Sequence, residues 1–117
     1  MRHQKGNKKL NKPTDQRLAM LKSLVISLFE NQKIKTTDLR AKEASKLASR
    51  LITLSKVDTL HSRRQALKVL PNKSIIKILF SDIKDKFKDR NGGYTRVTKL
   101  GLRRGDAATI SLLELVD

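Results

Sequence analysis

The spacing of apolar residues changes along the chain, and for most of its length it follows the period of an α-helix. From residue 14 onward, large apolar side chains recur every three or four positions in four successive stretches. Thr14, Thr37 and Asn72 stand where three of these stretches begin, and Thr and Asn are residue types that commonly cap a helix. The pattern predicts four helices, over about residues 15–31, 38–55, 59–70 and 73–87.

Three shorter stretches have the pattern of strands. Residues 33–37, KIKTT, are rich in β-branched side chains, and the final third of the chain contains two extended runs, 94–100 and 107–116, joined by GLRRGD. The turn-forming sequence DRNGG precedes the first run, so the two runs predict a hairpin. Apolar residues occur at both odd and even positions of 107–116, as in a strand that is buried on both sides for part of its length.

These elements predict an α+β fold. The last strand belongs at the centre of a small sheet, with 94–100 on one side and 33–37 on the other. We expect two layers, a three-stranded mixed sheet covered by about four helices, in the order α-β-α-α-α-β-β. Because 117 residues allow one core, residues 14–117 are predicted to form a single domain.

The first thirteen residues, MRHQKGNKKLNKP, differ in kind from the rest. They contain five cations, no acid and a single large apolar residue, Leu10. Since such a stretch cannot bury an apolar face, we expect residues 1–13 to form an extended basic arm that becomes ordered only on a partner. The same stretch lacks the apolar segment of a secretory signal, so the protein is expected to stay in the compartment where it is made.

The charge of the whole chain points to a polyanionic partner. The chain has 27 Lys and Arg against 11 Asp and Glu, a formal net charge of +16 at pH 7. The absence of cysteine excludes disulfides and thiolate metal sites. No apolar run approaches the ~20 residues that cross a bilayer, so a membrane span is not expected.

The sequence offers no recognisable catalytic site. The carboxylates show no paired spacing, and no glycine-rich phosphate-binding motif is present. The two histidines, His3 and His61, stand in the basic arm and beside an arginine pair, where a polar or RNA-facing role is the ordinary explanation. We therefore expect no enzymatic activity, no metal and no cofactor.

Nucleic-acid binding is better supported, because the arginines are grouped. Seven of the ten lie in the arm, at 63–64 or between 90 and 104, and guanidinium groups suit phosphate and guanine edges. With three Phe and one Tyr, the chain is expected to recognise shape and phosphate rather than stacked bases. Tyr94 either stacks on RNA or packs at the hairpin edge. A nucleoid-type or other DNA-binding protein is the alternative, and an enzyme acting on RNA comes third.

Several motifs together resemble a known family. They are the start MRHQKGNKKLN, the stretch IKTTDLRAKEASKLASRLITL at 34–54, LHSRRQA at 60–66 and DRNGGYTRVTKLGLRRGDAA at 89–108. Nearly end to end and in one register, the chain resembles the bacterial large-subunit ribosomal protein L17 family. The resemblance implies one strand, four helices and two further strands. It also implies binding to large-subunit ribosomal RNA near the exit of the nascent-peptide tunnel, contact with neighbouring ribosomal proteins, a cytoplasmic location and no enzymatic activity.

The resemblance further implies which residues contact RNA. Family members commonly carry Ser-His-Arg near the first helix, and this chain keeps only the arginine, Arg17. Gly92 and Gly93 would let backbone N–H groups approach phosphate, or would supply a positive φ. We expect phosphate neutralisation by the arm together with a preformed basic face on the domain. The implied RNA contacts are Arg2, His3, Lys5, Lys8, Lys9, Lys12, Arg17, Arg63, Arg64, Arg90, Asn91, Gly92, Tyr94, Arg96, Lys99, Arg103 and Arg104.

Overall fold

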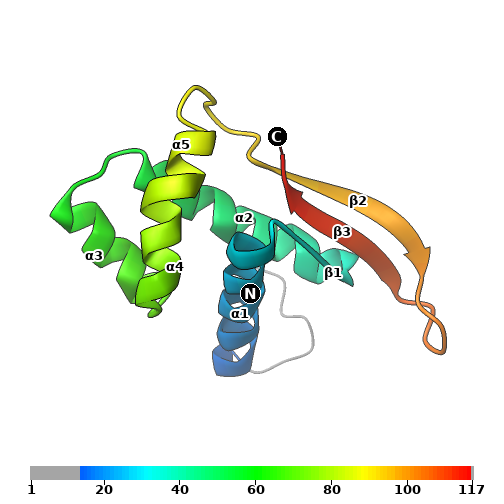
Figure 1. The fold of residues 1–117 in the computed structure, drawn as a ribbon. Coiled ribbons are helices and arrows are strands. Elements are labelled where there is room, and N and C mark those ends of the chain that lie inside the picture. The colour runs from blue at the N-terminus through cyan, green and yellow to red at the C-terminus, as the bar shows by residue number, and fades with distance from the viewer. Residues whose placement is uncertain (1–13, 117) are drawn as a thin grey trace, which may run out of the picture.

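The computed structural model describes residues 14–116, so the predicted basic arm, residues 1–13, lies outside the described residues. Helices and strands follow the predicted order, and Figure 1 shows the strands gathered at one end of the molecule and the helices beside and behind them. The elements are α1 (Thr14–Asn31), β1 (Lys33–Thr37), α2 (Asp38–Ser55), α3 (Leu60–Val69), α4 (Lys73–Ile78), the π-helical segment η1 (Leu79–Ile83), α5 (Lys84–Lys86), β2 (Thr95–Leu102) and β3 (Thr109–Leu115).

All four predicted helices are confirmed, with α4, η1 and α5 following one another without a break as the fourth. The side chain of Thr59 accepts a hydrogen bond from the backbone N–H of Ser62, and that of Asn72 accepts one from Ile75, so both residues cap a helix. Thr37 has the extended backbone of a cap but makes no side-chain cap bond. None of the helices in the described part of the chain is long and apolar enough to cross a membrane.

The three strands form one sheet in the order β1-β3-β2, which confirms the central position of the last strand. The prediction of a mixed sheet is wrong, because both neighbours of β3 run antiparallel to it. Asp38, the first residue after β1, accepts a hydrogen bond of 2.7 Å from the hydroxyl of Ser111, near the start of β3. This bond requires the end of β1 to lie beside the start of β3, and therefore an antiparallel pair.

One face of the sheet is buried, and the other is largely open. Ser111, Leu113 and Leu115 of β3 are buried, whereas Ile110 and Leu112, which point the opposite way, are partly exposed. The expectation of burial on both sides is therefore wrong. Helix α2 lies along the buried face and contacts all three strands, while α3 and α4 pack against helices (Figure 1). The apolar even positions of β3 remain partly exposed because none of the described elements covers that face as α2 covers the other.

Helix α2 is the centre of the core. Its buried side carries Ala41, Ala44 and Ala48, small side chains that let neighbouring elements approach closely. The hydroxyl of Ser45 lies 2.6 Å from that of Thr95 and ties α2 to the start of β2. Large side chains from α1 and from the α4–α5 stretch, including Phe29, fill the rest of the core. The two-layer α+β arrangement is therefore confirmed, with α2 as the element that joins sheet and helices.

Candidate nucleic-acid interface

The exposed arginines lie in two groups at opposite ends of the molecule. Arg63 and Arg64 belong to α3, and Arg103 and Arg104 belong to the connection between β2 and β3 (Figure 1). The longest axis of the fold measures 45 Å, so these residues do not share one patch. The structure thus does not bring the predicted contacts together on a single basic face, and each end has to be described by itself.

At the α3 end, Arg63 is held by other residues of the chain. Its guanidinium donates hydrogen bonds of 2.7 and 3.0 Å to the carboxylate of Asp58, and it lies 5.1 Å from the ring centroid of Phe80. The hydrogen bond from Arg63 lowers the pKa of Asp58, and the pKa of Arg63 is raised in return. Lys84 also lies 3.5 Å from the Asp58 carboxylate. Arg64, one residue on, is exposed and has no ion-pair partner within residues 14–116.

At the opposite end, Arg103 and Asp106 close the turn between β2 and β3. Arg103 Nε donates a 3.0 Å hydrogen bond to Asp106 Oδ1, a second guanidinium nitrogen bonds to Oδ2, and Oδ1 also accepts from the backbone N–H of Ala108 at 3.2 Å. Mainly through the Arg103 hydrogen bond, the pKa of Asp106 is lowered to about 2. Arg104 lies in the same exposed turn. Arg103 is therefore committed to the turn, whereas Arg104 is presented to the solvent.

The open face of the sheet carries cations that sequence reasoning missed. Arg96 of β2 lies 3.0 Å from the carboxylate of Glu114, which also faces Lys33 across the sheet. Lys33 and Lys35 alternate with Ile34 on β1 and therefore share this open face. The alternation of KIK along a strand was the signal that could have identified both lysines. Lys99 is exposed opposite Ser111 and contributes a weak charge effect to the lowered pKa of Asp38, whose main cause is the hydrogen bond from Ser111.

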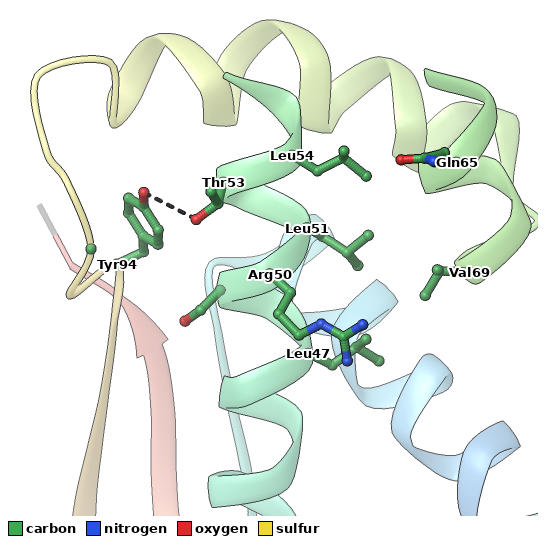
Figure 2. A pocket seen from close by; sticks show the side chains of 10 residues that line it. Leu47, Arg50, Leu51, Thr53, Leu54, Gln65, Val69 and Tyr94 are labelled. Atoms are coloured by element: carbon green, nitrogen blue, oxygen red, sulfur yellow. Dashed lines mark hydrogen bonds between the residues drawn. The ribbon is translucent and has the colours of Figure 1, made fainter. Parts of the chain in front are cut away.

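Tyr94 packs within the fold, which is one of the two alternatives considered for it. The side chain is 3% exposed, and its ring lies 5.3 Å from that of Phe87. Thr53 of α2 donates a 3.3 Å hydrogen bond to the Tyr94 hydroxyl, as Figure 2 shows, and this bond is the main cause of the lowered pKa of Tyr94. The Lys56 ammonium lies 5.1 Å from the ring centroid. The ring is therefore not available to stack on a base in this conformation.

The turn before Tyr94 is attached to α2. The Lys56 ammonium donates a hydrogen bond to the carbonyl oxygen of Arg90, and the Arg90 guanidinium donates one of 3.4 Å to the carbonyl oxygen of Gly93. Gly92 and Gly93 both have positive φ, 115° and 61°, which accounts for glycine at these positions. Asn91 and Arg90 are exposed beside them. The structure thus confirms the conformational reason for the two glycines.

The remaining predicted contacts have different surroundings. Arg17 is 8% exposed on α1, so little of its side chain faces solvent. His61 is exposed on α3. The arm residues Arg2, His3, Lys5, Lys8, Lys9 and Lys12 lie outside the described residues. Over residues 14–116, no group of three or more His, Asp or Glu side chains gathers as metal ligands would.

Two hollows lie beside α3. The larger, about 680 Å³, separates α2 from α3: Leu51 and Leu54 point toward Gln65 and Val69, with Arg50 at its edge (Figure 2). The smaller, about 370 Å³, lies between α3 and α4 and is lined by Leu60, Arg63, Arg64, Leu67, Lys73, Ile76 and Lys77. Sequence reasoning treated the helix-four lysines as a solvated face and did not single out Arg50. Their helical spacing from apolar neighbours was the available signal.

Comparison with known proteins shows what the chain is similar to. The family described as Ribosomal protein L17 matches residues 20–116. A large ribosomal subunit protein bL17 from Dictyoglomus thermophilum is 53% identical over 116 residues, which cover 99% of this chain and 100% of that protein. Proteins of the same name are 49% identical over 116 residues in Desulforapulum autotrophicum (99% of this chain, 97% of that protein) and 53% over 111 residues in Clostridium tetani (95% and 98%).

Proposed function

Because the chain belongs to the ribosomal protein L17 family, we propose that it is a structural constituent of the large ribosomal subunit that binds large-subunit ribosomal RNA. The observation that carries this proposal is the 53% identity to a large ribosomal subunit protein bL17 over the full length of that protein. The family is one of structural ribosomal proteins, so the chain has no enzymatic role, and it works in the bacterial cytoplasm. We place its site near the exit of the nascent-peptide tunnel, in contact with neighbouring ribosomal proteins.

The mechanism proposed is neutralisation of phosphates at several separate points. Arg64 on α3 and Arg104 in the β2–β3 turn are exposed cations at opposite ends of the fold, and residues 1–13 add five more. Each cation that contacts a phosphate releases counterions, and this makes the affinity strongly dependent on salt. Contacts at separated points also fix the orientation of a protein on folded RNA. The proposed role is therefore to hold together RNA segments that lie tens of ångströms apart.

Co-sedimentation with ribosomal subunits through a high-salt gradient tests the proposal. We expect the protein to travel with the large subunit and to be absent from the small one. A variant with both Arg64 and Arg104 changed to Ala should dissociate at lower salt, while Lys22→Ala on α1 serves as the matched control for lost charge. A protein that leaves the subunit completely in salt and binds duplex DNA tightly as a dimer would instead support the DNA-binding alternative.

A further inference from the structure

The groove between α3 and α4 has an apolar floor. Leu60 and Leu67 of α3 are seven residues apart, two helical turns, and so lie on one side of that helix. Ile76 of α4 faces them across the groove and is itself buried, whereas Leu60 is 64% exposed. An exposed leucine beside a hollow of about 370 Å³ leaves apolar surface in contact with water. A flat apolar group bound there would remove that surface from water.

The rim of the same groove is cationic. Arg63 and Arg64 line it from α3, and Lys73 and Lys77 line it from α4, with no acid among the described residues that line it. Asp58, which binds Arg63, holds that guanidinium in a fixed position. A fixed guanidinium is one of the surfaces on which an unstacked RNA base can lie. Apolar floor and cationic rim together match a base and its flanking phosphates.

We propose that the α3–α4 groove receives a single unpaired nucleotide of RNA. The base lies against Leu60, Leu67 and Ile76, and the phosphates on either side of it lie at Arg64, Lys73 and Lys77. The inference rests on the proposed binding to ribosomal RNA and names the RNA feature that this surface recognises. Bulged nucleotides suit such a site because their bases are already free of the helical stack, so less unstacking energy is needed to insert them.

The larger hollow between α2 and α3 does not fit this ligand as well. Arg50 is the single cation among the described residues that line it, so it offers no row of contacts for successive phosphates. Its walls are otherwise formed by aliphatic side chains such as Leu47, Leu51 and Leu54. Charge complementarity to a polynucleotide therefore favours the α3–α4 groove. Arg50 provides a matched test residue, because it borders a hollow on the same pair of helices without belonging to this groove.

Binding of the full chain to two synthetic RNA hairpins tests the proposal. The hairpins have the same stem, and one carries a single extra unpaired nucleotide whose base is the fluorescent adenine analogue 2-aminopurine. We expect the bulged hairpin to bind about tenfold more tightly, which corresponds to about one charge-assisted hydrogen bond. The emission of the analogue should rise on binding as the base leaves its neighbours and enters the groove.

Variants on the groove and away from it locate the contact. Lys73→Ala with Lys77→Ala should lower the affinity for the bulged hairpin about tenfold, and Leu60→Ala should reduce the preference for the bulge while affinity for the plain stem is retained. Lys88→Ala, which removes an exposed charge beyond α5, and Arg50→Ala should leave the preference unchanged. Circular dichroism of each variant confirms that the fold is intact, which is expected because Leu60, Lys73 and Lys77 are exposed.

The possible outcomes separate this inference from the proposed function. Equal affinity for the two hairpins, or a bulge preference that survives both groove variants, would overturn the groove assignment while leaving ribosomal RNA binding in place. Loss of the preference in Arg50→Ala alone would move the site to the larger hollow and overturn it as well. Binding of neither hairpin, together with failure to sediment with the large subunit, would overturn both proposals.

Discussion

Arg103 and Arg104 are adjacent in the chain but have different surroundings. Arg103 is bound to Asp106 across the turn, and Arg104 is exposed without an ion pair within residues 14–116. A charge that already has a carboxylate partner must give up that partner before it contacts a phosphate. At the scale of single residues, the same side chain therefore serves the fold at one position and remains available for RNA at the next.

Separate substitution of the two arginines should distinguish these roles. Arg104→Ala is expected to leave the melting temperature nearly unchanged and to lower the affinity for a ribosomal RNA fragment about tenfold, because one charge-assisted contact is lost. Arg103→Ala is expected to lower the melting temperature slightly and to change RNA affinity less. Thermal unfolding and RNA titration of both variants measure this. The opposite pattern, with Arg104→Ala destabilising and RNA affinity intact, would assign the bracing role to the wrong residue.

The turn should also keep its ion pair at low pH. The pKa of Asp106 is lowered to about 2 in the folded protein, against about 4 for an unfolded chain. A depressed carboxyl pKa adds stability above the unfolded value, and that stability is lost as the pH falls from about 4 through about 2. NMR titration of the Asp106 carboxyl carbon should show a midpoint near 2, and Arg103→Ala should move it toward 4. A midpoint near 4 in both proteins would contradict the pairing.

Residue environments were the part that the sequence predicted least well. Arg96 meets Glu114 only because of the pairing register of β2 and β3, and Arg63 meets Phe80 only because α3 packs on the following helix. Neither contact follows from local spacing, since the partners are 18 and 17 positions apart. Tyr94 is a similar case: its neighbours Gly93 and Arg96 suggested an exposed hairpin edge, and Phe87 and Thr53 bury it.

At the scale of elements, periodicity was a reliable guide to helices and strands but not to strand direction. The stripe from Ile75 to Phe87 predicted one helix and did not reveal the π-helical segment within it. There the hydroxyl of Ser81 donates a 2.6 Å hydrogen bond to the carbonyl oxygen of Lys77. The direction of β1 was equally hidden, because the Asp38–Ser111 bond that accompanies it joins residues 73 positions apart.

The start of α4 offers a test at this scale. The Asn72 side chain accepts a 3.2 Å hydrogen bond from the Ile75 N–H, so Asn72→Ala leaves that donor without its partner. We expect a loss of about 1 kcal/mol in the free energy of unfolding, measured by denaturant titration, as is typical for a removed N-cap. Asn72→Asp keeps the acceptor and serves as the control. Equal losses in the two variants would show that the cap bond is not the cause.

At the scale of the whole molecule, charge is distributed rather than concentrated. The cations of α3, the open sheet face and the β2–β3 turn lie on different parts of a fold that is 45 Å long. Such an arrangement predicts that no single region accounts for the salt dependence of binding. The basic residues of the first thirteen positions add to this total from the sequence alone.

Deleting residues 2–12 measures the share of that segment. The deletion removes five cations, so the slope of log K against log salt on a ribosomal RNA fragment should shrink by about 3 to 5 if all of them contact phosphate. A double Arg64→Ala, Arg104→Ala variant should reduce the slope by about 2 on the same basis. Titration at several salt concentrations gives both values. An unchanged slope after the deletion would show that this segment does not neutralise phosphates.

The central position of β3 has a consequence for how the protein is made. β1 and β2 are each joined to the sheet through β3, and β3 follows both of them in the chain. During synthesis neither strand can find its partner until residues 109–115 have been added, so the helices can assemble early while the sheet forms last. A translation product that stops before residue 109 has two strands and no ladder, and exposes the side of α2 that the sheet covers. Unfinished chains are therefore marked for proteolysis by the order in which their strands are synthesised.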